Sequence, residues 1–334
     1  MISRHVLVTG GCGFIGSTLV RRLIARDYMV TVLDALTYSG RVENLTAVAA
    51  DSRLEIVVGD IADTHLVQEL FSTHQFSGVI NLAAETHVDR SISDTGAFIT
   101  TNVQGTQNLL DEARRYWQAL NDEREERFRF VQVSTDEVFG SLGPEGYFTE
   151  KSPYAPRSPY AASKAAADHL AAAAFHTHGL PVITTYCGNN YGPRQYPEKF
   201  IPLTIKNALA GESIPVYGDG KNIRDWVHVE DHADGLIAAL GRGAPGSRYC
   251  LGSQNELTNL EVLDLVCAAL EVIRPSHGGT KYRDLATFVA DRLGHDRRYA
   301  LDATKAMGEL GFTPRHTLQA SIVEVVRSYV EGSS

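Results

Sequence analysis

The chain has 334 residues, of which 31 are Lys or Arg and 40 are Asp or Glu, giving a formal net charge of −9. Proteins that hold nucleic acid by neutralising its phosphates need a basic surface, so this balance argues against a nucleic-acid partner. With 43% hydrophobic and 21% charged residues the composition is that of a globular protein, and the length suggests about two domains or one large α/β unit.

Membrane proteins and metalloproteins are also disfavoured. No apolar stretch approaches the ~20 residues that cross a bilayer, and the N-terminus lacks the apolar core of a signal peptide, so we expect a cytoplasmic protein without membrane contact. The one close histidine pair, His176 and His178, does not share a helical face, so no metal site is expected. Neither a disulfide framework nor a zinc site fits the cysteines, which are far apart and form no CxxC pair: Cys12, Cys187, Cys250 and Cys267.

Short apolar segments alternate with helical patterns over the first 190 residues. Strands are predicted at residues 5–9, 29–34, 54–60, 78–83, 128–134 and 181–186. Helices are predicted at residues 14–26, 65–73, 97–120 and 161–178. Continuous apolar strands separated by helices indicate a parallel sheet covered on both faces. The predicted fold class is therefore α/β, with a doubly wound Rossmann-type parallel sheet.

The character of the sequence changes near residue 190. Prolines become frequent at positions 193, 197, 202 and 215, and the stretch around Gly218 and Gly220 is rich in turn residues. We expect a smaller, mixed α/β lobe to begin there. The predicted division is a dinucleotide-binding domain at residues 1–188 and a substrate lobe at residues 189–334, with some C-terminal segments returning to the first domain.

A glycine loop follows the first predicted strand. Gly10, Gly13 and Gly16 give the spacing GxxGxxG, between a strand and a helix. Such a loop allows a tight turn, a close backbone approach to a pyrophosphate and a helix N-terminus aimed at its charge. Asp34 ends the second strand 18 residues after Gly16, where an acid binds ribose hydroxyls and repels a 2′-phosphate, which favours NAD over NADP. Asp60 ends the third strand, and an adenine contact and a simple loop acid are equally good interpretations of it.

Tyr160 and Lys164 form a YxxxK pair, which places both side chains on one helical face. An ammonium beside a phenol favours the phenolate and lowers the tyrosine pKa from its ordinary value of about 10. The tyrosine can then act as a base towards an alcohol that loses a hydride. Thr135, at the end of the preceding strand, completes a hydroxyl–tyrosine–lysine set typical of short-chain dehydrogenase/reductase proteins.

Two acids, Asp136 and Glu137, directly follow the strand that ends at Ser134 and Thr135. The carboxyl ends of strands in an open α/β sheet face the ligand crevice, so both acids are expected beside the reacting group. A dehydrogenase or an epimerase needs only the tyrosine. An elimination needs a further base for a carbon-bound proton and an acid for the departing hydroxyl, and paired carboxylates can divide those roles.

Nine blocks of the sequence resemble the signature blocks of dTDP-glucose 4,6-dehydratases, which are extended short-chain dehydrogenase/reductase enzymes. The blocks run from residue 7 to residue 302, so the resemblance covers nearly the whole chain. The glycine loop and YxxxK are shared by the superfamily, whereas the Asp136–Glu137 pair, NNYGP with PEK, and GHDRRYA are far more specific. The blocks are GGCGFIGS, LDALTYSG, LAAETHVDRSI, TNVQGT, STDEVFG, SPYAASK, NNYGPRQYPEKFIPL, YGDGKNIRDWVHVEDH and DRLGHDRRYALD.

The resemblance implies a tightly bound NAD that is regenerated in every turnover. It also implies a reaction of deoxysugar biosynthesis, in which dTDP-glucose gives dTDP-4-keto-6-deoxyglucose and water. Tyr160 would deprotonate the 4-hydroxyl while hydride leaves carbon 4, and Thr135 would hold the oxygen at that carbon. Glu137 would then remove the proton at carbon 5 and Asp136 would protonate the hydroxyl leaving carbon 6, to which hydride returns. The implied cofactor-binding residues are Gly10, Gly13, Phe14, Ile15, Gly16, Asp34, Thr37, Asp60, Ile61, Ala83, Ala84, Thr101, Tyr160, Lys164 and Asn189.

The resemblance extends to the nucleotide-sugar site and to assembly. Arginine forks suit a diphosphate. Family members usually dimerise through two long helices, here 97–120 and 161–178, so a homodimer is expected. The chain departs from the family pattern at Tyr186, Gly188, Arg194 and Leu293, and Gly188 is expected near the nicotinamide. The implied nucleotide-sugar contacts are His87, Thr135, Asn190, Glu198, Lys199, Arg224, Asn259, Arg292 and His295.

Three alternatives remain open. The first is a 4,6-dehydratase of another nucleotide sugar such as UDP-glucose, because base selection depends on a few contacts in the lobe. The second is a nucleotide-sugar 4-epimerase, against which the carboxylate pair argues. The third is a non-catalytic NAD-binding sensor, which would be expected to have lost Tyr160, Lys164 or the acids.

Overall fold

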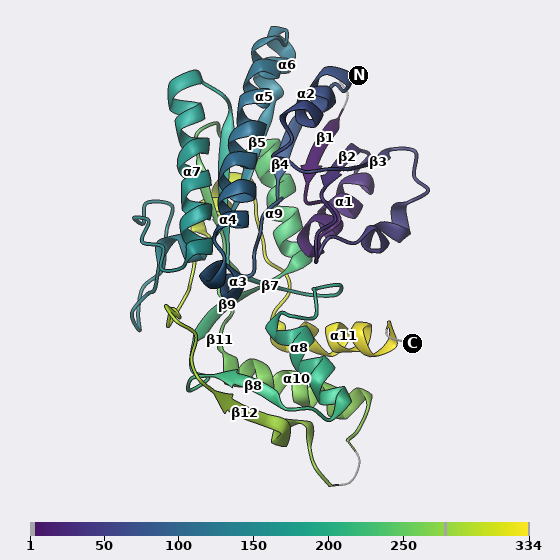
Figure 1. Ribbon diagram of the computed structural model, residues 1–334, viewed down its shortest axis with the longest axis vertical. Helices are drawn as coiled ribbons and strands as arrows, with labels where there is room; N and C mark the ends of the chain where they lie inside the picture. The colour runs from purple at the N-terminus through teal and green to yellow at the C-terminus, as the bar shows by residue number, and fades with distance from the viewer. Residues whose placement is uncertain (1–3, 277–278, 333–334) are drawn as a thin grey trace.

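The computed structural model describes residues 4–276 and 279–332, which form a large α/β layer structure with a smaller lobe beside it (Figure 1). The central sheet has seven strands in the order β10-β6-β5-β4-β1-β2-β3, and every neighbouring pair is parallel. The strands are β1 (His5–Thr9), β2 (Met29–Asp34), β3 (Leu54–Val58), β4 (Gly78–Asn81), β5 (Arg129–Thr135), β6 (Val182–Cys187) and β10 (Arg248–Leu251). The predicted doubly wound parallel sheet is therefore confirmed.

Helices cover both faces of this sheet, as continuous burial of the strands requires. On one face α1 and α9 pack against each other and enclose a core that includes Leu19, Leu23 and Leu236. On the other face α2, α5 and α7 enclose a core that includes Val67, Leu109 and Phe130. The bounds are α1 (Phe14–Ile24), α2 (Thr64–Thr73), α5 (Thr106–Gln118), α7 (Pro159–His178) and α9 (Val229–Arg242).

The segment predicted as one helix over 97–120 is built in three parts. A short turn, α4 (Gly96–Phe98), leads into a π-helical stretch, η2 (Ile99–Gly105), before α5 begins. Such wider turns are frequent at functional sites. Within η2, Asn102 is buried, accepts a hydrogen bond from the Glu85 N–H at 2.8 Å and donates to Ser163 Oγ at 2.8 Å. The wider turn thus fixes the loop after β4 to helix α7.

Shorter helical segments complete the large domain. The charged run after residue 120 forms a short helix without buried residues, α6 (Asp122–Arg127). The acidic pair predicted at the end of the fifth strand begins a 3₁₀ turn, η3 (Asp136–Phe139). The remaining segments are η1 (Val42–Val48) and α3 (Val88–Ser93).

The smaller lobe has its own core around Ile205, Val262 and Val326, and its strands are mixed, as predicted. In a three-stranded sheet β9 pairs parallel with β7 and antiparallel with β11, and a separate parallel pair joins β8 and β12. The strands are β7 (Asn189–Tyr191), β8 (Ile214–Tyr217), β9 (Ile223–His228), β11 (Glu256–Thr258) and β12 (Ala286–Val289). The helical segments are α8 (Phe200–Ala210), α10 (Asn259–Ile273), η4 (Tyr282–Leu285), η5 (Ala306–Leu310) and α11 (Leu318–Glu331).

The chain crosses between the two parts more than once. After β9 it returns to the large sheet through α9 and β10, and residues such as Leu310 and Phe312 add to the core under α1. The strand order reverses between β1 and β4, so a crevice opens at the carboxyl ends of these strands, where ligands bind in such sheets. Within residues 4–276 and 279–332, no helix is both long and apolar enough to cross a membrane.

Candidate active site

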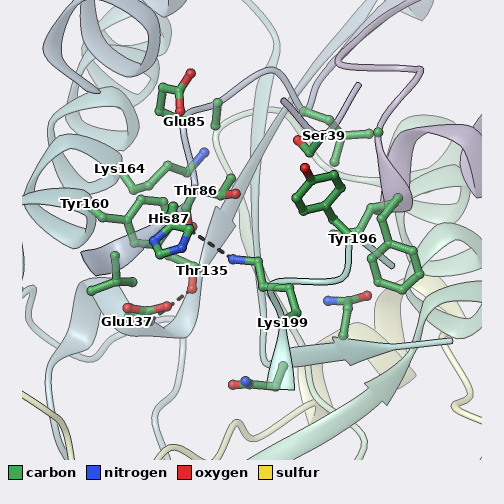
Figure 2. A pocket seen from close by; sticks show the side chains of 18 of the residues that line it. Ser39, Glu85, Thr86, His87, Thr135, Glu137, Tyr160, Lys164, Tyr196 and Lys199 are labelled. Atoms are coloured by element: carbon green, nitrogen blue, oxygen red, sulfur yellow. Dashed lines mark hydrogen bonds between the residues drawn. The ribbon is translucent and has the colours of Figure 1, made fainter. Parts of the chain in front are cut away.

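A cavity of about 720 Å³ lies at the carboxyl ends of the central strands, between the sheet and the lobe (Figure 2). Every cofactor, catalytic and substrate residue implied by the sequence lines it, although these residues span positions 10 to 295. Figure 2 shows Tyr160, Lys164 and Glu137 on one side of the cavity, and Lys199 and Tyr196 facing them. The fold thus places one set of side chains around a single enclosed space.

The glycine loop is shaped to hold a phosphate group against the backbone. Gly10 has φ 67°, and a Cβ there would lie 2.9 Å from the Ala83 backbone nitrogen. A Cβ on Gly16 would overlap the Gly10 carbonyl oxygen. Helix α1 begins after Gly13 with no side chain capping it, so N–H groups of its first turn remain available to an anion at the positive end of the helix. The loop therefore fits a dinucleotide pyrophosphate.

Asp34 is anchored at the end of β2. Its Oδ2 accepts the Cys12 N–H at 2.8 Å and its Oδ1 accepts the Leu36 N–H at 2.9 Å. Burial raises the pKa of this carboxyl group, and the two backbone hydrogen bonds oppose that shift. Each oxygen keeps acceptor capacity for a ribose hydroxyl. Asp60 also lines the cavity, and its Oδ1 closes the local turn by accepting the Ala62 N–H; an adenine contact of Asp60 stays a prediction.

Tyr160 and Lys164 occupy the first turns of α7. Ser158 caps this helix by accepting the Ala161 N–H, and the Tyr160 N–H donates to Ser91 Oγ at 3.2 Å. The ammonium of Lys164 donates to the Val133 carbonyl oxygen at 2.7 Å. Both side chains are buried, so the backbone and the strand beside it hold them in place.

The pKa of Tyr160 differs from the expectation that Lys164 lowers it. Burial raises this pKa well above the usual value, and the charges of Glu137 and Asp136 raise it further, while a hydrogen bond with Thr135 opposes the shift. Lys164 directs its ammonium to a backbone carbonyl, and burial lowers its own pKa. The sequence pattern alone does not reveal how far a side chain is buried, so it could not show that burial affects the pKa of Tyr160 more than the nearby Lys164 ammonium does.

Asp136 and Glu137 differ in surroundings although they are adjacent. The Thr135 hydroxyl donates to Asp136 Oδ1 at 3.2 Å and accepts the Glu137 N–H at 3.3 Å, while Asp136 Oδ2 is buried without a partner. Burial and then the Glu137 charge raise the pKa of Asp136 well above normal. Burial also raises the pKa of Glu137, but Arg224, Lys199 and Arg292 oppose it. The pair therefore suits a proton donor, Asp136, beside a base, Glu137.

Cations from distant parts of the chain surround this pair. Arg224 Nη2 donates to the Asp296 carbonyl oxygen at 2.9 Å, and its guanidinium lies 4.3 Å from the centre of the Tyr299 ring. Arg292 forms an ion pair with Asp89 at 2.6 Å. Lys199 donates to the Thr86 carbonyl oxygen at 3.2 Å, across the cavity (Figure 2). A protein of net charge −9 thus presents local positive charge where a diphosphate would enter.

The remaining predicted substrate residues fall into two groups. Glu198 Oε1 is buried without a partner, and His87 Nε2 lies 3.5 Å from Glu198 Oε2, so this carboxylate can still accept a hydroxyl. Asn190 is already satisfied: its Nδ2 donates to the Gly188 carbonyl at 3.1 Å, and His232 Nδ1 contacts its Oδ1 at 3.0 Å. His295, paired with Asp291, and two further predicted residues, Asn189 and Asn259, also line the cavity.

The structure adds cavity residues that the sequence interpretation did not select. Four of them lie inside the quoted blocks: Tyr38, Tyr196, His232 and Tyr299. The family resemblance therefore covered these residues, but it did not single them out as site residues. Burial lowers the pKa of His232 to about 3, which keeps this ring neutral beside Asn190. Other cavity residues, such as Gly59 and Pro215, lie outside the quoted blocks and are brought in only by tertiary structure.

The four departures from the family pattern lie in different local surroundings. A Cβ on Gly188 would lie 2.6 Å from the Asp225 carbonyl oxygen, so β7 and β9 approach closely there. Tyr186 is fully buried and its hydroxyl lies 2.6 Å from that of Tyr154, outside the cavity lining. Arg194 takes up φ 70°, and Leu293 is 77% exposed. None of them occupies an acid–base position.

One cluster in the described part of the chain could offer three metal ligands. Atoms of His228, Glu230 and His316 lie within 4.8 Å of one another. However, Glu230 pairs with Arg22 at 3.2 Å, and His228 Nδ1 accepts the Glu230 N–H. Because these groups already have partners, we assign no metal to them.

Three features together define an extended short-chain dehydrogenase/reductase. They are a Rossmann-type sheet with a GxxGxxG loop, a buried tyrosine and lysine on one helix, and a lobe that borders the same cavity. The family model described as GDP-mannose 4,6 dehydratase matches residues 7–325. A dTDP-glucose 4,6-dehydratase of Xanthomonas campestris pv. campestris (strain B100) is 51% identical over 324 residues, covering 97% of this chain and 92% of the relative. One of Neisseria gonorrhoeae is 50% identical over 336 residues, covering 99% and 97%.

Among solved structures, DesIV, a dTDP-glucose 4,6-dehydratase from Streptomyces venezuelae with NAD bound, superposes with a TM-score of 0.88. The two sequences are 45% identical, and the match covers 98% of this chain and 97% of the other. The chain belongs to the dTDP-glucose 4,6-dehydratase family, whose members are NAD-dependent hydro-lyases.

Proposed function

We propose that this chain converts dTDP-glucose to dTDP-4-keto-6-deoxyglucose and water, with NAD as its tightly bound cofactor. The observation that carries the proposal is the Asp136–Glu137 pair: a buried and a half-buried carboxyl group with unequal surroundings, in a cavity that also holds Tyr160 and Lys164. An oxidation alone would not need this pair, whereas loss of water needs an acid and a base together.

The cavity fits the dinucleotide at one end. The Gly10–Gly16 turn and the start of α1 would hold the pyrophosphate, and Asp34 would accept the adenosine ribose hydroxyls. NAD, when bound, accepts a hydride from carbon 4 of the sugar and returns one to carbon 6. Further residues proposed to line the cofactor site are Thr37, Asp60, Ile61, Ala83, Ala84, Thr101 and Asn189.

Tyr160 would take the proton of the 4-hydroxyl. Its raised pKa makes the phenol a weak acid, and therefore a strong base once it ionises. Thr135 supplies a hydroxyl at the end of β5 to hold the oxygen at carbon 4. Lys164, fixed on the Val133 carbonyl, would contribute positive charge beneath the tyrosine.

Glu137 and Asp136 would then divide the elimination. A ketone at carbon 4 acidifies the proton on carbon 5, and Glu137, kept more readily ionised by Arg224, Lys199 and Arg292, would remove it. Asp136 holds its proton because of burial and the neighbouring negative charge, so it would protonate the hydroxyl leaving carbon 6. Water leaves, and the carbon–carbon double bond accepts the returning hydride at carbon 6 and a proton at carbon 5.

The lobe would bind the nucleotide diphosphate. Arg224 and Arg292 carry planar guanidinium groups suited to phosphate oxygens, and Lys199 adds a third positive charge. Glu198, with one unpartnered oxygen, would accept a sugar hydroxyl. His87, Asn190, Asn259 and His295 would complete the substrate contacts.

The alternatives predict different outcomes in one experiment. Purified protein is incubated separately with dTDP-glucose and UDP-glucose, without added reductant, and the products are analysed by mass spectrometry. The proposal requires the loss of one water from dTDP-glucose. Turnover of UDP-glucose alone would reassign the nucleotide, an epimer of unchanged mass would favour the epimerase, and two unchanged substrates would favour the sensor.

The assembly, the location and the domain division of the chain belong to the same proposal. We propose a homodimer formed through α5 and α7, which pack side by side and expose small residues such as Ala162 and Ala173. A cytoplasmic location is consistent with four free cysteines and with NAD and a nucleotide sugar as ligands. Residues 1–188 would form the NAD-binding domain, joined by α9 and β10, and most of 189–334 the substrate lobe.

A further inference from the structure

The loop between β7 and α8 crosses from the lobe to the large domain beside the cavity. Its Tyr196 packs edge-on against Tyr38, with ring centroids 5.5 Å apart and an interplanar angle of 80°. The guanidinium of Arg41 lies 5.2 Å over the Tyr196 ring, and that of Arg90 lies 4.2 Å over the Tyr38 ring. We call Tyr38, Arg41, Arg90 and Tyr196 the aromatic clasp. Each arginine thus stacks on one tyrosine, and the edge-on contact between the two tyrosines joins the two lobes.

Polar contacts fasten the same loop beside the stack. The Tyr38 hydroxyl lies 3.3 Å from Thr86 Oγ1, and Lys199 donates to the Thr86 carbonyl oxygen at 3.2 Å. Arg90, besides stacking on Tyr38, pairs with Glu198 at 3.4 Å. Two separate segments of the large domain, residues 38–41 and 86–90, therefore hold residues 196–199 of the lobe.

The backbone on both sides of the clasp is also held in unusual conformations. Leu36 has φ 47° and Arg194 has φ 70°, so a non-glycine residue adopts the left-handed region in each of the two loops that meet. Such conformations persist where the surroundings determine them. On the lobe side, the Tyr329 hydroxyl donates to the carbonyl oxygens of Gly192 at 3.0 Å and Gln195 at 3.1 Å. Both loops thus have defined conformations, and the lobe loop is held by hydrogen bonds within the protein.

The clasp lies beside the expected path of the cofactor. Tyr38 directly follows Thr37 and lies four residues after Asp34, while Thr86 follows the loop that contacts Gly10. Tyr38 and Tyr196 both line the cavity, and Figure 2 shows Tyr196 near Ser39, on the side away from Tyr160 and Lys164. A dinucleotide that extends from the glycine loop to Tyr160 would therefore lie next to the contact between Tyr38 and Tyr196.

We propose that the aromatic clasp encloses NAD, so that the cofactor leaves only when Tyr196 and Tyr38 separate. This inference rests on the proposed function only in taking NAD as the ligand. It explains how one cofactor can stay in place between the two hydride transfers: the exit path is closed by contacts between protein segments and does not depend on bound sugar. Opening separates the ring contacts and the Arg90–Glu198 ion pair, whose arginine is half exposed, so the clasp can still open during cofactor loading.

The test measures NAD release from the holoenzyme in the absence of any sugar. Protein loaded with NAD is mixed with excess 1,N6-etheno-NAD, and the rate at which the fluorescent analogue replaces NAD is recorded. We expect Tyr196→Leu and Tyr38→Leu each to release NAD at least tenfold faster than the wild type. The double variant should be only slightly faster than either single variant, because both substitutions remove the same ring contact.

Tyr147→Leu provides the matched control. Arg298 lies 5.8 Å over the Tyr147 ring, which is half exposed and outside the cavity lining, so this variant also removes an arginine–tyrosine stack. Its NAD release should match the wild type. Arg41→Met keeps both tyrosine rings and removes only one cation, so its NAD release rate should lie between those of the wild type and the tyrosine variants. This milder variant keeps the proposal testable if a tyrosine variant does not fold.

NAD release within twofold of the wild type in both folded tyrosine variants would overturn the proposal. Equal acceleration by Tyr147→Leu would also overturn it, because the effect would then be general loosening. A wild-type protein that holds NAD yet does not dehydrate dTDP-glucose would refute the proposed function while leaving this release measurement fully interpretable.

Discussion

Asp136 and Glu137 show how the fold gives adjacent, similar side chains different chemistry. Their position after β5 follows from the sequence, because a strand that precedes two acids places them at the ligand edge of a parallel sheet. Their unequal pKa shifts could not be predicted, because the cations that act on Glu137 are Lys199, Arg224 and Arg292, which only the folded lobe brings near. The expected pKa of Tyr160 was wrong for the same reason: burial, a tertiary property, dominates.

Replacing the proposed base tests its role directly. Glu137→Gln keeps the shape of the side chain but cannot accept the carbon 5 proton, so turnover of dTDP-glucose should fall by about 10²- to 10⁴-fold. Binding of the nucleotide sugar, measured by calorimetry, should remain close to the wild type. Glu145→Gln, at an exposed position outside the cavity, serves as the control. Near-normal turnover of Glu137→Gln would remove this residue from the mechanism.

The acidic limb of the pH–rate profile should report the same carboxylate. Glu137 must be ionised to act, and its pKa is raised, so activity should be lost as the pH falls through a value above that of an ordinary glutamate. Arg224 opposes this rise. In Arg224→Gln the pKa of Glu137 should increase, and the acidic limb should move up by about 1 pH unit. This shift is measured in kcat with saturating dTDP-glucose, and a limb that stays in place or moves to lower pH would contradict it.

At the scale of elements, periodicity predicted the strands well and the segments between them less well. All six predicted strands are present, since continuous apolar runs must be buried. The seventh strand, β10, and the lobe strands β7 and β11 are only three or four residues long, too short for a periodic signal. The π-helical turn η2 depends on buried hydrogen bonds of Asn102, and the aromatic clasp depends on contacts between loops far apart in sequence.

The start of α1 gives a prediction at this scale. Gly16→Ala would place a Cβ on the Gly10 carbonyl oxygen, so the loop must shift and the pyrophosphate would lose its cradle. We expect a loss of about 1–3 kcal/mol in the free energy of unfolding and protein purified with little NAD. Gly143→Ala is the matched control, because nothing lies within 4 Å of a Cβ there. Full NAD content in Gly16→Ala would show that the loop is not this tightly constrained.

At the scale of the whole molecule, two lobes with separate cores build one cavity from residues across most of the chain. Most cavity residues lie within the quoted sequence blocks, because several of these blocks end a strand or open a helix at the same edge. The way in which the chain returns from the lobe through α9 and β10 was expected only in outline. Bulk acidity, which argues against a nucleic-acid partner, coexists with local cations inside the cleft, because an average charge does not describe a pocket.

The central claim is that oxidation, elimination and reduction take place on one sugar within this cavity. It is tested most directly with dTDP-glucose that carries deuterium at carbon 4, converted by the purified holoenzyme and analysed by NMR spectroscopy. The account predicts that the product has lost one water and carries the deuterium at carbon 6, with a solvent-derived hydrogen at carbon 5. Deuterium that is retained at carbon 4, or is absent from carbon 6 of a dehydrated product, would contradict it.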